Sequence, residues 1–211
     1  GGISGLVLGL LYAPADYQQG NSYRIIFIHV PSALLAQSAY IMMAVASAVF
    51  LIWKMKMAAW VAKVVAPIGA ALCVISLFTG EGWGKQTWGT WWIWDARLTS
   101  MLVLFFLYFG VMVIHWVFDS AETGFKAAGI VSLVGLVNIP IIKYSVNWWN
   151  TLHQPATLKL TAKPSMHIDM LIPLLIMIAT TYTLFAILVI LRTRNEILWF
   201  ERKTRWVQKI M

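Results

Sequence analysis

The stretch IIFIHVPSALLAQSAYIMMAVASAVFLIW, Ile25 to Trp53, decides the fold, because it is long and apolar and contains no Asp, Glu, Lys or Arg. An α-helix needs about 20 such residues to cross the hydrocarbon core of a bilayer. The stretch follows the polar segment PADYQQGNSYR, residues 14–24, and ends at a short basic turn with Lys54 and Lys56. We interpret it as a membrane-spanning helix.

The whole chain has the composition of a polytopic membrane protein. Of its 211 residues, 60% are hydrophobic and 11% are charged, whereas soluble domains are about half apolar and a quarter charged. The apolar residues form blocks of bilayer length rather than a period-two alternation, which excludes an outer-membrane barrel. We therefore predict an all-α fold, built as a single integral-membrane domain over residues 1–211.

Six membrane-spanning helices are predicted. Gly1 to Ala13 is apolar but shorter than a span, so we interpret it as the outer part of a truncated first helix. The other five helices are expected at about residues 25–53, 57–78, 98–118, 127–144 and 168–191. The polar parts of the chain are the loop 14–24, the tryptophan-rich segment 80–100, the connection 146–167 and the basic tail 192–211.

The basic residues predict which way the chain faces. Ten of the sixteen lysines and arginines lie in or near the turns after the second and fourth spans and in the tail, and six lie on the other side. Positive charge accumulates on the cytoplasmic side of membrane proteins. The net charge of +8 therefore reports orientation rather than a nucleic-acid partner, and the segments 14–24, 80–100 and 146–167 are expected to face outward.

The tail 192–211 mixes basic residues with Trp199, Phe200 and Trp206 at helical spacing. This pattern favours an amphipathic helix that lies on the inner membrane surface and contacts lipid. Docking to a cytoplasmic partner is the alternative.

Two of the four histidines lie on the predicted outward side, near the tryptophan-rich segment. His29 is close to the outer end of its span and His153 is in the connection 146–167, whereas His115 is at the inner end of the span 98–118. A histidine within a membrane protein is costly and suggests function, although a hydrogen bond to another helix is the alternative for His29, and an incidental place in a polar loop is the alternative for His153. Two imidazoles on opposite faces are a common axial ligand pair for haem iron.

The residues near these histidines suit a flat, apolar, dianionic ligand. Arg24 and Arg97 supply forked donors for two propionates, and Asp95 is expected to orient a neighbouring donor or to cap the following span. The only cysteine, Cys73, lies in an apolar block, so a haem would be haem b, held by coordination without thioether bonds. Rigid faces for a porphyrin come from Trp83, Trp88, Trp91, Trp92 and Trp94. An interfacial aromatic belt is the alternative interpretation of these tryptophans.

The segment WGTWWIWDARLT, Trp88 to Thr99, resembles the WWD motif of the haem-handling proteins of cytochrome c biogenesis. Two further stretches, APADYQQGNSYRIIFIHVP at residues 13–31 and VNIPIIKYSVNWWNTLHQ at residues 137–154, closely resemble the CcmC family of the bacterial cytochrome c maturation pathway. The similarity covers nearly the whole chain up to about residue 154 and weakens afterwards.

The resemblance implies a six-helix protein of the bacterial inner membrane, in which His29 and His153 bind haem at the periplasmic face beside the WWD segment. It also implies delivery of haem to the periplasmic chaperone CcmE, together with CcmD and the ABC-type subunits CcmA and CcmB, since the chain itself has no Walker motif. The chain would then be a transfer subunit and not an enzyme. His167 is kept as an alternative ligand to His153.

Other functions stay open at this point. Another haem protein of the WWD group would use the same residues, whereas a structural assembly subunit would use the tryptophans as a docking surface. A quinone-reactive cytochrome is disfavoured because no histidine lies near the middle of a span. His153 and His167 have the spacing of a cytochrome b pair, but Pro155 and Pro164 between them argue against one continuous helix.

Overall fold

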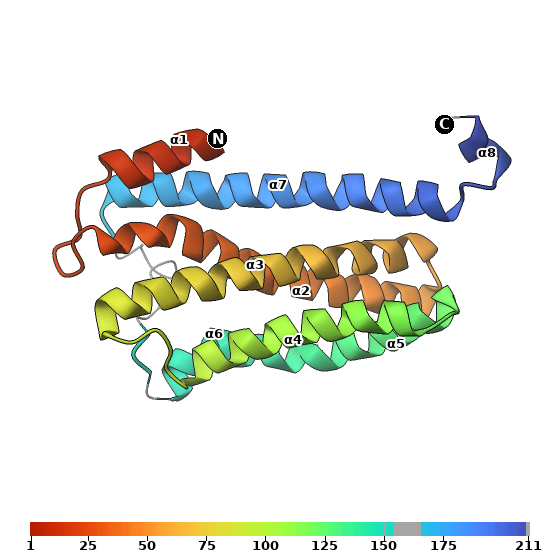
Figure 1. Cartoon of the computed structure of the whole chain (residues 1–211), viewed down its shortest axis with the longest axis horizontal. Helices are drawn as coiled ribbons and strands as arrows, with labels where there is room; N and C mark the ends of the chain where they lie inside the picture. The colour runs from red at the N-terminus through yellow and green to blue at the C-terminus, as the bar shows by residue number, and fades with distance from the viewer. Residues whose placement is uncertain (150, 154–165, 210–211) are drawn as a thin grey trace.

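The protein is a bundle of long helices that run side by side, as the computed structural model in Figure 1 shows. The structure describes residues 1–149, 151–153 and 166–209. Within them, five helical stretches are long and apolar enough to cross a membrane: Ser22–Trp53, Lys56–Trp88, Ala96–Val117, Ala121–Trp148 and Ile168–Phe200. The prediction of an all-helical, polytopic membrane protein is confirmed for these residues.

Short helical turns interrupt or extend several of the spans. In chain order the elements are α1 Gly2–Val7, η1 Leu8–Tyr12, η2 Ser22–Ile25, α2 Ile26–Trp53, α3 Lys56–Trp88, α4 Ala96–Val117, α5 Ala121–Val134, η3 Gly135–Val137, α6 Asn138–Trp148, α7 Ile168–Phe200 and α8 Arg205–Gln208. Of the six predicted spans, five are therefore present at full length. The first is the short apolar piece Gly2–Tyr12, which packs against α7.

Helix α3 is longer than its predicted span. The sequence predicted an end near residue 78, because the glycines of the segment GEGWG lower helix propensity, but α3 continues to Trp88. Close packing on α2 accounts for the difference: a Cβ on Gly80 would lie 3.0 Å from Cε1 of His29. The helix ends where Gly89 takes a φ of +78°, the left-handed conformation that glycine adopts readily. The predicted loop 80–100 is thus helical as far as Trp88.

Helix α7 also runs past its predicted end at Leu191 and continues to Phe200. An ion pair of 2.7 Å between Lys63 of α3 and Glu196 ties this extension to the bundle. The first part of the predicted amphipathic tail, as far as Phe200, therefore continues α7. Residues 210 and 211 of the tail, and residues 150 and 154–165 of the connection 146–167, lie outside the described residues.

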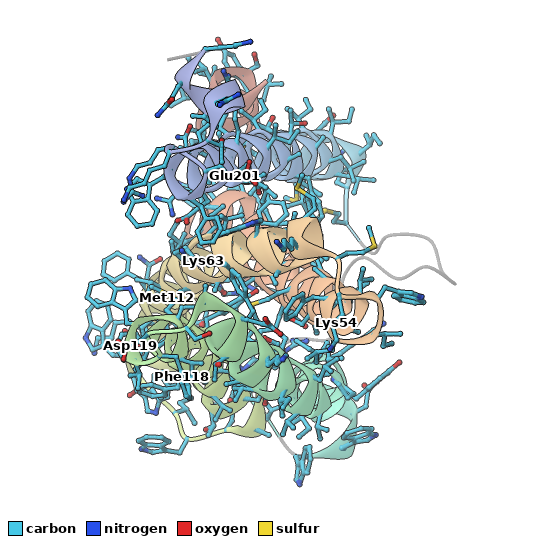
Figure 2. The ribbon with its side chains drawn as sticks, turned by 90° about the vertical axis from the view of Figure 1, so that its right-hand side faces the viewer. Lys54, Lys63, Met112, Phe118, Asp119 and Glu201 are labelled. Carbon is cyan, nitrogen blue, oxygen red and sulfur yellow. The ribbon has the colours of Figure 1, made fainter. Side chains whose placement is uncertain are left out.

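The polar connections meet at one end of the bundle, where α3 ends and where α4 and α7 begin (Figure 1). Two contacts join them there: Trp83 Nε1 donates to Gln19 Oε1 at 2.7 Å, and His153 Nδ1 lies 2.7 Å from Asp95 Oδ2. Figure 2 looks onto the opposite end, which carries the turns that contain Lys54 and Asp119. The sequence argument placed these two groups of turns on opposite sides of the membrane, and the bundle separates them.

Small residues let the helices touch at the centre of the bundle. The Tyr108 hydroxyl of α4 donates to the Ala36 carbonyl of α2 at 2.7 Å, and its ring meets Tyr40 edge to face at 5.0 Å. Gly69 of α3 makes room for this ring, since a Cβ there would overlap Cζ of Tyr108. Within a bilayer, close packing and interhelical hydrogen bonds hold helices together, because lipid tails are as apolar as the helix surfaces.

Replacing Gly69 with alanine should therefore push α3 away from α4 and destabilise the bundle by about 1–3 kcal/mol. Thermal unfolding in detergent would show this as a lower midpoint. Gly110→Ala on α4 is the matched control, since a Cβ at Gly110 meets nothing within 4 Å. Equal midpoints for the two variants would contradict the packing described here.

Candidate functional site

A cavity of about 250 Å³ lies at the end of the bundle where the polar connections meet. Five of the residues singled out from the sequence line it: His29 from α2, Trp83 and Trp88 from the end of α3, Arg97 from the start of α4, and His153 from the segment after α6. Most of the other lining residues are apolar. The fold thus brings together side chains that are far apart in the chain.

His29 is held by the neighbouring helix. Its Nδ1 lies 3.0 Å from the carbonyl oxygen of Ser76 and 3.1 Å from the hydroxyl oxygen of Thr79. A carbonyl oxygen only accepts, so Nδ1 carries the proton and the lone pair is on Nε2. Nε2 has no hydrogen-bond partner within the described part of the chain. Trp83 meets the imidazole edge to face, with ring centroids 5.8 Å apart.

His153 is held by a carboxylate. Its Nδ1 lies 2.7 Å from Asp95 Oδ2, and Trp88 meets its ring with centroids 4.8 Å apart. Burial lowers the pKa of His153 below its ordinary value, although the neighbouring Asp95 acts in the opposite direction. The imidazole is therefore neutral at pH 7, with its proton on Nδ1 and its lone pair on Nε2.

Asp95 accepts hydrogen bonds on both carboxylate oxygens. Oδ1 accepts the backbone N–H of Leu98 at 2.8 Å, which caps α4, and Oδ2 accepts from His153 and from the Thr151 hydroxyl. Burial alone would raise the pKa of Asp95, but the hydrogen bonds from Thr151 and Leu98 and the nearby His153 hold it below its ordinary value. Asp95 thus caps the following helix, which is one of the two alternatives expected for it, and it also accepts a hydrogen bond from the His153 ring.

The donor set fits a haem better than a bare metal ion. Metal-binding histidines generally donate their second ring N–H to a carbonyl or a carboxylate, and both histidines of the cavity do so. Among the residues that the structure describes, no group of three or more His, Cys, Asp or Glu side chains could hold a metal ion. A haem brings four in-plane nitrogens and needs only two axial ligands. Arg97 adds a positively charged side chain to the lining of the cavity.

Besides Asp95, which lies behind His153, four of the residues proposed from the sequence do not line this cavity. Because α3 ends at Trp88, the following residues project from the end of the bundle: Trp91 and Trp94 are 58% and 77% exposed. Trp92 packs edge to face on Trp94, with centroids 5.3 Å apart. Arg24 donates to the backbone carbonyls of Leu10 and Ala13, so its guanidinium holds the end of η1.

The other two histidines lie elsewhere. His167 begins α7, where its Nδ1 accepts the backbone N–H of Asp169 at 3.4 Å, and its side chain is 65% exposed. It does not line the cavity. His115 lies near the far end of α4 and packs on Phe125, with centroids 5.4 Å apart. The separation of His115 from the outward site, expected from its depth, is confirmed.

Several residues that shape the site carried no signal in the sequence. Ser76, Thr79 and Gly80 surround His29, and they share one face of α3 at helical spacing. That face would have been recognisable only with α3 extended beyond residue 78. Thr151 is an ordinary polar loop residue by sequence, and only the fold places its hydroxyl on Asp95.

The chain was also compared with known proteins. It matches the family model of CcmC, heme exporter protein C, over residues 2–208. It is 48% identical to heme exporter protein C of Haemophilus influenzae over 206 residues, which is 98% of this chain and 84% of that protein. The heme exporter protein C of Escherichia coli K12 is 50% identical over 208 residues, 98% of this chain and 83% of that protein.

A plant relative is similar over the same region. The putative cytochrome c biosynthesis ccmC-like mitochondrial protein of Marchantia polymorpha is 46% identical over 202 residues, 95% of this chain and 86% of that protein. The match to the family model continues to residue 208, well beyond the motifs that end at residue 154. With its bundle of membrane-spanning helices and this near full-length similarity, the chain belongs to the CcmC family, the heme exporter protein C family of cytochrome c maturation.

Proposed function

We propose that this protein binds haem b at the periplasmic face of the bacterial inner membrane and delivers it to the chaperone CcmE. His29 and His153 are the axial ligands. One observation carries the proposal: both imidazoles line the same cavity, each with Nδ1 occupied by an acceptor and Nε2 available. The protein acts as a transfer subunit with CcmD and the ABC-type subunits CcmA and CcmB, and not as an enzyme.

The other lining residues have distinct roles in this proposal. Trp83 and Trp88 pack on the flat faces and edge of the porphyrin, and they also exclude water from the iron. Arg97 pairs with a propionate, because its planar guanidinium matches a carboxylate. Bound haem would supply the iron that both Nε2 atoms coordinate, and the protein supplies position and charge.

The depth of the site suits hand-over to a partner in the periplasm. Helix α4 has 22 residues, or about 33 Å at the helical rise, which is close to the thickness of the hydrocarbon core. Asp95, directly before it, therefore lies at the membrane border. The exposed Trp91 and Trp94 lie at the same end and offer apolar surface for contact with CcmE. The distribution of basic residues supports the outward orientation of this end.

Replacing either His29 or His153 with alanine should abolish the six-coordinate spectrum of the haem protein, because each supplies one axial ligand. Spectra of oxidised and reduced protein, purified from haem-replete cells, would measure this. His167→Ala is the control and should keep the original spectrum, since His167 caps α7 away from the cavity. A loss of haem in His167→Ala alone would refute the ligand assignment.

Gly80→Ala should disturb His29 without removing it. The added Cβ would lie 3.0 Å from Cε1 and 3.4 Å from Nδ1 of His29, so the ring must shift. We expect a weakened axial bond, seen as a mixture of high-spin and low-spin haem in the absorption spectrum. Gly82→Ala is the matched control, because its Cβ would meet Ile25 at an ordinary 3.7 Å. If both variants keep the parent spectrum, α3 does not hold His29 as described.

Replacing Trp88, which lines the cavity, and replacing Trp94, which is exposed outside it, should have different effects on haem binding. Trp88→Ala should lower haem retention roughly tenfold while the axial spectrum is unchanged, since an aromatic contact of about 1.4 kcal/mol corresponds to that factor. Trp94→Ala should retain haem and slow its transfer to CcmE, because Trp94 is exposed outside the cavity. Haem retention after detergent washing and transfer to purified CcmE would test both. Equal retention by the two variants would count against the cavity as the haem site.

A further inference from the structure

The two histidines of the cavity are anchored by acceptors of different charge. His29 donates to the Ser76 carbonyl and lies beside the Thr79 hydroxyl, both neutral groups on α3. His153 donates to the Asp95 carboxylate at 2.7 Å, a shorter contact with a charged group. The two imidazoles therefore differ in the charge of their hydrogen-bond acceptor before any ligand binds.

The Asp95 carboxylate is buried, and both of its oxygens accept hydrogen bonds. Its residue is 8% exposed, and its two oxygens accept from the Leu98 backbone, the His153 ring and the Thr151 hydroxyl. A carboxylate with three donors stays ionised, and it keeps a fixed orientation because the Leu98 contact makes it part of the α4 N-terminus. The negative charge is thus held rigidly behind the His153 ring.

Thr151 connects this carboxylate to the backbone of the ligand. Its hydroxyl oxygen accepts the His153 backbone N–H at 3.1 Å while the hydroxyl hydrogen points to Asp95 Oδ2. Residues 151–153 are thereby closed into a short turn against α4. Trp88 also packs on the ring, with centroids 4.8 Å apart. The hydrogen bonds through Thr151 and Asp95 fix the orientation of the His153 ring at the cavity.

We propose that Asp95 and Thr151 are positioning residues that make His153 the stronger electron donor of the two axial ligands, so that the site favours ferric over ferrous haem. This inference rests on the proposed function, because it needs His29 and His153 to bind the same iron. A carboxylate that accepts the Nδ1 proton gives the imidazole partial imidazolate character and raises its basicity. Ferric iron gains more than ferrous iron from such a ligand because it carries the greater charge.

The two positioning residues should act on this preference in opposite directions. Asp95→Asn removes the charge and leaves one acceptor oxygen in place of two. With that oxygen turned toward His153 it still accepts from the ring, and the cap on the Leu98 N–H is lost. Thr151→Val removes a donor that competes with His153 for Oδ2, so more of the carboxylate charge acts on the imidazole. A purely structural defect would move both variants in the same direction.

The test is a redox titration of the full-length haem protein in detergent, followed by its absorption spectra. In Asp95→Asn we expect a six-coordinate spectrum and a roughly tenfold lower ratio of ferric to ferrous affinity, which equals a midpoint potential about 59 mV higher. In Thr151→Val we expect a lower potential together with weaker haem retention, because the turn of residues 151–153 loosens.

Two control variants separate the effect of the helix cap from the effect of the contact between Asp95 and His153. Asp95→Ser can still cap α4 but is too short to reach His153, so it should give partly five-coordinate haem. Ser120→Ala removes the side-chain cap of α5 at the other end of the bundle and should leave the potential unchanged. Loss of stability without a change of potential in Asp95→Asn would reduce Asp95 to a helix cap and overturn the inference.

The outcomes also separate this inference from the proposed function. If the parent protein binds no haem, or if His29→Ala and His153→Ala leave its spectrum unchanged, the proposed function fails. If those variants behave as expected while Asp95→Asn and Thr151→Val keep the parent potential, or shift it in the same direction, only the positioning role fails. Opposite shifts of the midpoint potential in Asp95→Asn and Thr151→Val would support the positioning role.

Discussion

The close approach of α2 and α3 is the constraint on which the rest of the structure depends. Within a membrane, a polar side chain must find its partner inside the protein. His29 does so by donating to a carbonyl of α3, whose second lone pair is available beside the helical hydrogen bond. Gly80 makes this approach possible, since any side chain there would meet the imidazole. The same packing carries α3 past its glycines and brings Trp83 and Trp88 to the cavity.

The second half of the site depends on one buried charge rather than on helix packing. Asp95 joins the start of α4, the hydroxyl of Thr151 and the ring of His153 through its two oxygens. One histidine therefore comes from a long helix and the other from a short turn held by a carboxylate.

The two ends of the bundle have different characters. At the end with the cavity, the polar contacts are specific and converge on two histidines and one carboxylate. Figure 2 shows the opposite end. By sequence, basic residues outnumber acidic ones in its turns and in the tail, and the ion pair of Lys63 with Glu196 ties the extension of α7 to α3. Charge at this end fits the orientation of a membrane protein, and the candidate site lies at the other end.

The sequence by itself determined the helical membrane architecture, the approximate spans, the residues of the WWD segment and the two histidines, because long apolar blocks are typical of spans and polar residues are rare within them. Only the tertiary structure decided that Trp83, Trp88 and Arg97 join the histidines while Trp91, Trp94 and Arg24 do not. It also decided that Thr151 is part of the site and that α3 stays helical through its glycines. The physical reason is that hydropathy depends on local composition, whereas the direction of a side chain depends on contacts between helices that are far apart in the chain.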